Sequence, residues 1–528
     1  MGWPWLLLFG CAGDAEPPGD SSVSDSGEVV ADSCGLVAAY GDRVDPTWSA
    51  TLGEVQRCDA PAAEVSYTEV GAAWGLQPAL DTSAEHLAGG VLAADDFDGD
   101  GDVDLVLGFA AETPVLYLRE GDGFVQQEVP GLAGMAGGQN PITLVDLDGD
   151  GRRDLLVVGP PPAIVWNRAE GFEVETWWAI ESVGATHALP ADLDGDGELD
   201  LFVLAQGGTE DERADRVLWG PAWTEEVLPT PTSSGLGLDG FVFDYEQDGD
   251  LDVYVVNDQG AEYGGNVLWR NEGGALSPAD CSCDVVVPGM GGDLGDVDGD
   301  GLLDLYVSAT EHNLLLQQQA DHTFVDVAEA TGADPLGEVD RMSWGSPIFD
   351  HDNDGLLDLL IAEGDLWRAT DEFPVKRSWT VDLLVQSRDP EMRFTDRAAE
   401  LGLDLEGSWR AGLPLDHNGD GVLDLLVTDV VEQPRLWLSD GCTAAGWLEV
   451  RAPAHSRVTA CVDGEQRVAW VRPESGWGAA HLPFVHLGLG EHQELEALVV
   501  ETLDGRVGVL EGPVDARRAV EWKRGSDR

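Results

Sequence analysis

The amino-acid sequence predicts an all-β protein built from similar units, and three observations lead to this fold class. A ten-residue acidic pattern recurs seven times along the 528 residues. Each copy is followed by a short run rich in Leu and Val, such as DLVLG or DLFVL, which is typical of a buried strand rather than a helix. A second short strand, with an aromatic residue in most copies, comes next. Such a period indicates a solenoid, a propeller or an array.

The seven copies are numbered here as loops one to seven. They begin at Asp96, Asp146, Asp192, Asp244, Asp296, Asp350 and Asp416. The steps between these first residues are 50, 46, 52, 52, 54 and 66 residues, which is the size of one supersecondary unit.

Each loop has the residue types of a cage for a hard cation. Oxygen-bearing side chains stand at positions 1, 3, 5 and 9, and a Gly at position 6 lets the backbone fold back so that the position-7 carbonyl points inward. We expect Ca²⁺, because Mg²⁺ prefers octahedral geometry with retained waters and softer metals call for His or Cys. The predicted side-chain ligands are Asp96, Asp98, Asp100 and Asp104; Asp146, Asp148, Asp150 and Asp154; Asp192, Asp194, Asp196 and Asp200; Asp244, Glu246, Asp248 and Asp252; Asp296, Asp298, Asp300 and Asp304; Asp350, Asp352, Asp354 and Asp358; and Asp416, Asn418, Asp420 and Asp424. The predicted carbonyl ligands belong to Asp102, Arg152, Glu198, Asp250, Leu302, Leu356 and Val422.

Two details qualify these cages. Position 12 is apolar, as at Leu107, so the bidentate Glu that closes an EF-hand is missing and we expect strand-loop-strand hairpins. Glu246 in loop four and Asn418 in loop seven depart from Asp at position 3, and these two loops should bind an ion more weakly or differently. A solvated acidic turn explains one such loop, but it does not explain seven copies with the same positions kept.

The strands between the loops predict a seven-bladed β-propeller with calcium-binding hairpin loops, followed by a small β-rich C-terminal domain. Each unit holds one strand before the loop, one after it, an aromatic strand and an outer strand such as FVQQEV from Phe124. The aromatic strands carry Tyr117, Trp166, Trp219, Trp269, Leu316, Trp367 and Trp437. A sugar-stacking stripe and packing between sheets both explain these rings, and Leu316 favours packing. Unit seven lacks an outer strand after Trp437, so we expect the strand at Tyr67 to complete it.

The N-terminus and the cysteines indicate export. The apolar stretch that ends at Leu8-Phe9-Gly10-Cys11 resembles the lipobox of bacterial lipoproteins, in which Cys11 would be lipidated, although no Lys or Arg precedes it and a plain secretory signal stays open. The other six cysteines fall into three local pairs, Cys34 with Cys58, Cys281 with Cys283, and Cys442 with Cys461, as disulfides of an oxidising compartment would. We expect residues 1–11 to be a signal, 12–63 an acidic tether rich in Pro, Gly and Ser, 64–441 the propeller and 442–528 the C-terminal domain.

The composition excludes several classes of function. The net charge of −72, with 28 Lys and Arg against 100 Asp and Glu, makes binding to nucleic acid improbable. The hydrophobic share of 43% and the 19 Trp argue for a folded core rather than disorder. No apolar run of 18 residues is present, so membrane contact is expected only through a lipid anchor.

The loops and strands over residues 64–441 resemble the FG-GAP and VCBS repeats of integrin α-subunit propellers and of many bacterial exported proteins. GWLEVRAP from Gly446, a turn at His486-Leu-Gly-Leu-Gly490 and a hairpin at Asp504-Gly505 resemble the ASPIC/UnbV module of cartilage acidic protein relatives. Thr502-Leu503 departs from that module, which usually has Trp-Pro there. The resemblance implies calcium binding and a surface role, and it implies little about activity.

Two functions of different class stay open. The first is a calcium-stabilised, exported or cell-surface protein that binds a protein or glycan ligand, expected to be a monomer; the second is a polysaccharide-acting lyase or hydrolase. The first is favoured, because the sequence has no HExxH, no GxSxG and no phosphate loop, and no catalytic residue is assigned. If a ligand site lines the central channel, its candidates are Arg341, Trp344, Trp409 and Arg410, and blade packing is the alternative role for them. His86, His187, His351 and His417 are expected to be structural, with the side chains of the last two pointing away from the ion.

Overall fold

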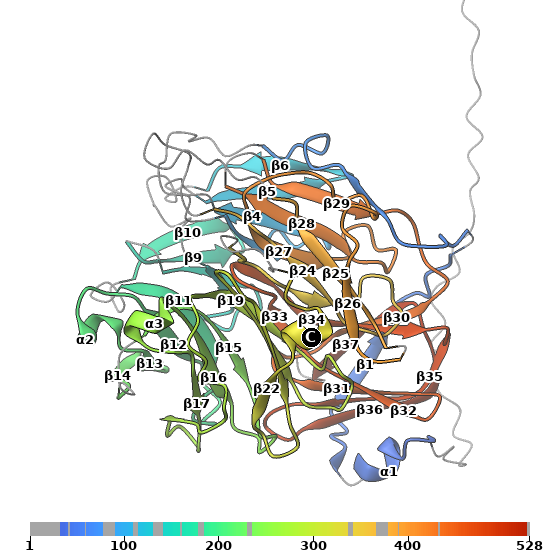
Figure 1. The fold of residues 1–528 in the computed structure, drawn as a ribbon. Coiled ribbons are helices and arrows are strands. Elements are labelled where there is room, and N and C mark those ends of the chain that lie inside the picture. Colours follow the sequence, from blue (N-terminus) through green and yellow to red (C-terminus); the bar gives the residue numbers. More distant parts are fainter. Residues whose placement is uncertain are drawn as a thin grey trace, which may run out of the picture. The chain divides into compact units, whose positions relative to one another are not determined.

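The computed structural model of this protein describes residues 32–40, 43–58, 60–77, 90–108, 114–129, 141–158, 161–177, 184–229, 235–335, 342–365, 379–388, 390–430 and 433–524 (Figure 1). All of them belong to one compact unit, Asp32–Arg528. Cys11, His86, Arg341 and Trp367 lie outside the described residues.

Within the described residues, each acidic loop joins the first two strands of an antiparallel four-stranded unit. The strands of the units are β3 (Val91–Asp95), β4 (Asp104–Gly108), β5 (Val115–Glu120) and β6 (Gly123–Gln127); β7 (Ile142–Val145), β8 (Asp154–Val157), β9 (Ala163–Arg168) and β10 (Gly171–Thr176); β11 (Ala185–Ala191), β12 (Asp200–Ala205), β13 (Arg216–Trp219) and β14 (Thr224–Val227); β15 (Leu236–Phe243), β16 (Asp252–Asp258), β17 (Val267–Arg270) and β18 (Ser277–Pro278); β19 (Gly289–Gly295), β20 (Asp304–Ala309), β21 (Leu314–Gln318) and β22 (Phe324–Asp326); β23 (Ile348–Phe349), β24 (Asp358–Ile361), β25 (Asp382–Ser387) and β26 (Arg393–Asp396); and β27 (Trp409–Leu415), β28 (Asp424–Asp429), β29 (Arg435–Ser439) and β2 (Tyr67–Glu69).

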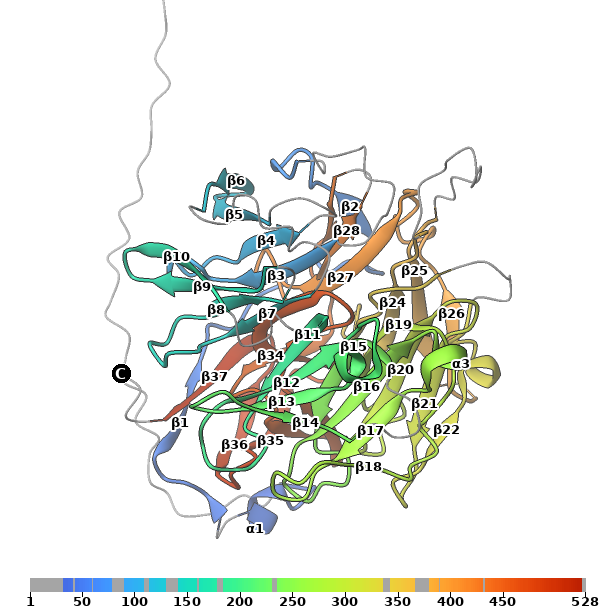
Figure 2. The same ribbon diagram turned by 90° about the vertical axis from the view of Figure 1, so that its left-hand side faces the viewer.

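The first strands of these units form a ring. Strands β3, β7, β11, β15, β19 and β23 contact one another in chain order, and β27 contacts β3. Between the last two units, the amide of Gly345 donates to the carbonyl of Arg410 over 2.8 Å. Figure 2 shows the units following one another around this ring. The predicted all-β propeller fold is confirmed.

The closing unit joins the two ends of the repeat region. Strand β2 pairs antiparallel with β29, with Tyr67 opposite Ser439 and Glu69 opposite Trp437. The ring is therefore latched by a strand from before the first loop, as the missing outer strand after Trp437 predicted.

Unit six differs from the prediction. Its third strand is β25, whose Leu384 pairs with Leu359, whereas Trp367, where this strand was expected, lies outside the described residues. The continuous apolar run Leu383-Leu384-Val385 in Asp382–Ser387 fits the position between β24 and β26, where this strand is mostly buried.

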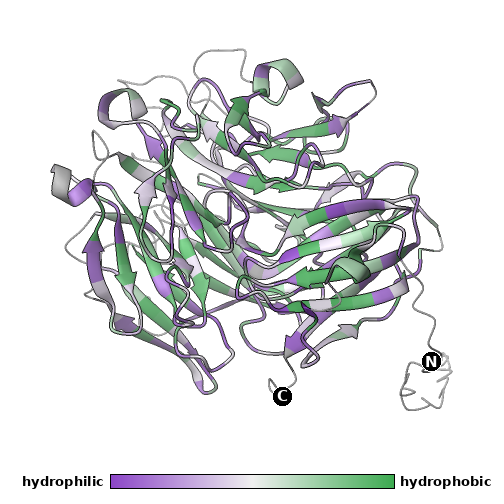
Figure 3. Cartoon of the chain, turned by 90° about the horizontal axis from the view of Figure 1, so that it is seen from below, coloured by the Kyte–Doolittle hydropathy of each residue, from purple (hydrophilic) through white to green (hydrophobic). Residues whose placement is uncertain are grey.

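The aromatic residues of the third strands mainly fill space between sheets. Tyr117, Trp269, Leu316 and Trp437 are at most 2% exposed. Figure 3 shows that apolar residues are concentrated on the strands. Packing, rather than a continuous stacking stripe, accounts for these four residues.

The C-terminal strands form a module of two packed sheets. One sheet has the order β1 (Trp48–Leu52), β37 (Arg518–Arg524), β30 (Gly446–Arg451) and β34 (Ala479–Gly490), with β33 (Arg472–Glu474) paired to β34; the other has the order β32 (Glu465–Trp470), β31 (Arg457–Val462), β35 (Glu494–Glu501) and β36 (Val507–Asp515). Leu448, Val458 and Leu498 lie in the apolar core between them. These strands are called the C-terminal module below.

The structure differs from the sequence expectation at two places in this module. His486 to Gly490, predicted as a turn, lies in the twelve-residue strand β34. Strand β1 and helix α1 (Leu36–Tyr40), within the segment predicted as a tether, pack on the module, and β1 pairs with β37. The hairpin at Asp504-Gly505 is present between β35 and β36, with Gly505 at φ +75°.

Residues 472–481, called the channel hairpin, enter the ring of first strands. Ala479 to His481 of β34 pair in parallel with Leu92 to Ala94 of β3, and β34 also contacts β7 and β27. On the other side, Arg472 forms an ion pair with Asp293 of β19. The ring thus holds a hairpin from the C-terminal module in its centre.

The disulfides correct two predicted pairings. Cys34 is bonded to Cys461 and Cys58 to Cys442, with sequence separations of 427 and 384 residues. The local pairs predicted for these four cysteines are wrong, because β1 and α1 fold onto the module and bring the N-terminal cysteines to it. The pair Cys281–Cys283 is confirmed.

The remaining helices are single turns. They are α2 (Glu210–Arg213), α3 (Gly260–Tyr263) and α4 (Ala328–Thr331). Across the part of the chain that the structure describes, none of the helices is long and apolar enough to cross a membrane.

Removing the Cys34–Cys461 bridge should cost more stability than removing the Cys281–Cys283 bridge. A disulfide stabilises mainly by restricting the unfolded chain, and the restriction grows with loop length. We expect the variant Cys34→Ser/Cys461→Ser to lose about 2–4 kcal/mol of unfolding free energy in denaturant titrations. The matched variant Cys281→Ser/Cys283→Ser should lose clearly less, and equal losses would contradict this account.

Candidate functional site: the seven acidic loops

Positions 1 and 6 close each loop in the same way. The position-6 Gly amide donates to Oδ2 of the position-1 Asp, which requires a left-handed backbone such as φ +97° at Gly101 and +98° at Gly249. The pairs are Gly101 and Asp96, Gly151 and Asp146, Gly197 and Asp192, Gly249 and Asp244, Gly301 and Asp296, Gly355 and Asp350, and Gly421 and Asp416, at 2.7–3.0 Å. The glycine is therefore needed for the turn itself.

Positions 5 and 7 form a second shared bond. The position-7 amide donates to Oδ1 of the position-5 Asp at 2.8–3.0 Å in every loop. The donors are Asp102, Arg152, Glu198, Asp250, Leu302, Leu356 and Val422, and the acceptors are Asp100, Asp150, Asp196, Asp248, Asp300, Asp354 and Asp420. The donor is the backbone amide of position 7, so this turn forms whichever side chain stands there.

The position-9 Asp has a role that the sequence analysis missed. It is at most 2% exposed in every loop, and both of its oxygens accept backbone N–H bonds. Oδ2 accepts from the position-2 amide at 2.9–3.1 Å, and Oδ1 accepts from an amide in or directly after the third strand at 2.7–2.9 Å. The residues are Asp104, Asp154, Asp200, Asp252, Asp304, Asp358 and Asp424. Each of these aspartates therefore ties its loop to the third strand of the unit. The signal for burial in the sequence was that an Asp stands directly before the apolar strand in every copy.

Unpartnered carboxylate oxygens remain at position 1. Among the described residues, Oδ1 of Asp192, Asp296 and Asp350 is buried and accepts no hydrogen bond. Ligand atoms from positions 1, 3 and 9 lie within 4.8 Å of one another in loops one to three. Three negative oxygens this close, one of them buried, repel one another unless a cation lies between them. The donor set fits a hard cation, and the carboxylates leave lone pairs free for it.

Burial and mutual repulsion appear in the protonation equilibria of these groups. Burial raises the pKa of Asp104 to about 6 and of Asp252 to about 8. Burial, followed by the charges of Asp420 and Asp424, raises the pKa of Asp416 to about 8. Without a cation, keeping these carboxylates ionised in the folded protein therefore costs free energy.

The divergent loops contain side chains that already have partners. Glu246 of loop four forms an ion pair with Arg270, and Nδ2 of Asn418 in loop seven donates to Asp420 over 3.0 Å. Asp148 of loop two likewise pairs with Arg168. A cation in these loops would either displace these partners or bind beside them.

The two histidines at position 2 behave differently from each other. Nδ1 of His351 lies 2.7 Å from Oδ2 of Asp358, so this side chain faces the position-9 carboxylate of its own loop. His417 instead packs between Trp74 and Phe124, with ring centroids 5.3 Å apart in both pairs. The expectation of an outward side chain fails for His351.

The channel candidates are buried and already contacted. Trp344, Trp409 and Arg410 are 4%, 0% and 0% exposed, and Cζ of Arg410 lies 4.2 Å from the centroid of the Trp344 ring. Nε1 of Trp344 donates to Gly364 over 2.8 Å. Trp477 of the channel hairpin lies on Trp344, with centroids 5.2 Å apart. A ligand-binding role for these residues stays a prediction, and it would require the hairpin to move.

His187 has the structural role that was expected of it. It is 3% exposed, and its Nδ1 lies 3.2 Å from Oδ1 of Asp239. Its Nε2 lies 3.6 Å from Oε2 of Glu474 in the channel hairpin. The imidazole thus connects the propeller to the hairpin.

A comparison with protein families agrees with the repeated architecture. The chain contains FG-GAP-like repeats, and the model of that repeat matches residues 96–157, 244–307 and 296–361. No curated protein sequence matches the chain. Similar solved structures include YCF48 bound to D1 peptide (9% identity, 73% of this chain and 98% of that chain, TM-score 0.42), an Agrocybe aegerita lectin in a study of its recognition of non-reducing terminal N-acetylglucosamine (17%, 64% and 88%, 0.39) and the V. cholerae biofilm matrix protein Bap1 (11%, 87% and 85%, 0.33). At these scores the likenesses carry no argument about function.

Positions 9 and 3 should respond differently to substitution. In the presence of chelator, Asp104→Ala should lower the unfolding free energy by about 3 kcal/mol, because the buried amide of Phe97 and the partly buried amide of Arg119 lose a charged acceptor. Asp98→Asn keeps its acceptor oxygen and should change stability by no more than about 0.5 kcal/mol under the same conditions. Denaturant unfolding measures both, and an Asp104→Ala variant as stable as the parent would contradict the role assigned to position 9.

Proposed function

We propose that this protein is a calcium-stabilised, exported binding protein that engages a protein or glycan through an exposed face of its propeller. The observation that carries the calcium part is the buried, unpartnered Oδ1 atom of Asp192, Asp296 and Asp350, each inside a carboxylate-lined loop. Bound Ca²⁺ would supply positive charge that the fold lacks there. Positions 1, 3, 5 and 9 and the position-7 carbonyls would hold it.

Export is the setting in which the other features fit together. Three disulfides suit an oxidising compartment, and millimolar external calcium would keep the loops loaded. We propose anchoring through Cys11 or secretion, and an ASPIC/UnbV-like identity for the C-terminal module. The net charge of −72 suits a solvated surface in that setting.

The ligand surface is proposed outside the ring, because the channel hairpin occupies its centre. The strongest candidate is a pair of half-buried rings, Trp177 after β10 and Trp223 before β14, with centroids 5.7 Å apart in a T-shaped arrangement. Trp223 has a left-handed backbone at φ +52°, a conformation that is costly for an aromatic residue and that the surrounding structure must therefore enforce. Rigid aromatic rings at a surface can stack on sugars or anchor a protein partner.

Removal of calcium should lower the melting temperature. At free Ca²⁺ about 100 times Kd, each site adds about 2.7 kcal/mol to the native state. Scanning calorimetry with Ca²⁺ and with chelator measures the shift, and Mg²⁺ at equal concentration is the control and should restore little of it. A melting temperature that chelator leaves unchanged would refute calcium stabilisation.

A screen of oligosaccharides, scored for both binding and cleavage, tests the ligand class. We expect binding without turnover, and we expect Trp177→Ala/Trp223→Ala to weaken it at least about tenfold, the effect of losing one or two stacked rings. Val227→Ala, an exposed change on the neighbouring strand β14, is the control and should bind as the parent does. Turnover of any glycan would contradict the binding-only proposal.

A further inference from the structure

The loops fall into two groups by what lies over them. A Cβ placed on the position-6 glycine of loops one to four, Gly101, Gly151, Gly197 and Gly249, would meet nothing within 4 Å. On Gly355 of loop six it would lie 1.8 Å from Nη1 of Arg467, and on Gly421 of loop seven 1.8 Å from the Trp447 ring. Arg467 and Trp447 belong to β32 and β30, so the C-terminal module covers the position-6 glycines of loops six and seven. It reaches Gly301 of loop five only through Arg457, at 3.9 Å, and it leaves the position-6 glycines of the first four loops open.

Asn353 at position 4 of loop six connects both covered loops to the module. Its Nδ2 donates to the carbonyl of Gly421 over 2.7 Å, and its Oδ1 lies 2.6 Å from Nε2 of His486. Its carbonyl accepts from the amide of Gly490 over 2.8 Å. Asn353 is 1% exposed and has φ +65°, at a position where five of the seven loops have Gly. Strand β34 is therefore held at its outer end by loop six.

The same strand continues into the ring. β34 runs without a break from Ala479, which pairs with Leu92 of β3, to Gly490, which contacts Asn353. A displacement of one end of a continuous strand is transmitted to the other, so the channel hairpin and loop six are mechanically connected.

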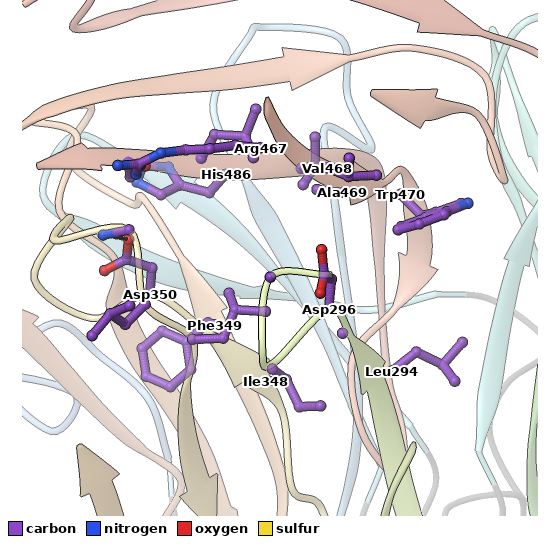
Figure 4. Close-up of a pocket in the computed structure, with 18 of the residues that line it drawn as sticks. Leu294, Asp296, Ile348, Phe349, Asp350, Arg467, Val468, Ala469, Trp470 and His486 are labelled. Carbon is purple, nitrogen blue, oxygen red and sulfur yellow. Dashed lines mark hydrogen bonds between the residues drawn. The ribbon is translucent and has the colours of Figure 1, made fainter. Parts of the chain in front are cut away.

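The contact between module and loops also leaves room for movement. A cavity of about 280 Å³ lies between loops five and six and strands β32 and β34. Figure 4 shows Asp296 and Asp350 on one side of it and Arg467 and His486 on the other. Asp350 is only 2% exposed and its Oδ1 accepts no hydrogen bond. The negative charge of loop six therefore faces the guanidinium of Arg467 across a cavity that side chains do not fill.

We infer that ion binding in loops six and seven holds β34 in place, and that ion loss releases the channel hairpin and opens the ring. This inference rests on the calcium binding proposed above. Without the ion, the carboxylates of Asp350, Asp352 and Asp354 repel one another, because the His351 imidazole lies against Asp358 and offsets only part of the charge. Loop six then loosens, and the contacts of Asn353 with His486 and Gly490 are lost. Withdrawal of the hairpin would uncover Trp344.

Hydrogen exchange followed by mass spectrometry on the full-length protein tests this inference. We expect chelator to speed the exchange of amides in residues 472–490 at least about tenfold. Asp352→Asn should speed it in the presence of Ca²⁺, whereas Asp194→Asn, the matched position-3 change in open loop three, should not. The two aspartates make equivalent hydrogen bonds. Asp352 accepts from the amide of Asp354 over 3.2 Å, and Asp194 accepts from the amide of Asp196 over 3.1 Å.

A second variant separates the contact from the ion. Asn353→Gly takes the residue that five other loops have at this position, tolerates its backbone, and removes only the side-chain contacts. We expect it to bind as many calcium ions as the parent in calorimetric titration and to exchange residues 472–490 at least about tenfold faster. If calcium binds and chelator, Asp352→Asn and Asn353→Gly all leave this exchange unchanged, or if Asp194→Asn speeds it equally, the inference is wrong. If no calcium binds at all, the proposed calcium function fails together with it.

Discussion

The buried aspartate at position 9 of each loop is the residue on which the rest of the propeller depends. Its two oxygens accept one amide from the loop and one from the third strand, as Asp304 does with Val297 and Gln318. A buried carboxylate with two such bonds fixes the loop to the sheet, because breaking either bond would leave a charged oxygen without compensation. The same carboxylate brings negative charge next to positions 1, 3 and 5. The geometry that orders each unit therefore also gathers negative charge that a cation would balance.

Arginine side chains balance part of the negative charge in these loops. Arg168 pairs with Asp148, Arg270 with Glu246, and Arg467 lies over Gly355, although the sequence holds only 28 basic residues. One arginine cannot balance four carboxylates, so the proposal of calcium accounts for the remainder. It also explains why oxygen-bearing side chains recur at the same four positions in all seven loops.

Periodicity decided which parts of this structure could be predicted from the sequence. The loops, the strands beside them and the closing strand at Tyr67 repeat at a regular step, and each copy supports the interpretation of the others. Features that occur once could not be inferred in this way. Cys34 bonds to Cys461 because β1 joins the module, and spacing along the chain contains no trace of that pairing. In unit six the motif DLWR at Trp367 matched the aromatic strands of the other units, so the third strand at Asp382–Ser387 was not expected. The channel hairpin around Trp477 has no repeat partner and no local motif, so the filled ring was not expected.

The candidate site divides in the same way. The positions of the cage residues follow from the pattern, whereas the difference between open and covered loops depends on tertiary contacts of Trp447, Arg467 and Asn353. The central claim is that Ca²⁺ lies among positions 1, 3, 5 and 9 of these loops, and the anomalous signal of calcium in crystals grown with the ion tests it most directly. The account predicts anomalous peaks inside the loops, strongest in those with Asp at all four positions. Crystals whose loops show no peak at saturating calcium, or peaks only elsewhere on the surface, would contradict it.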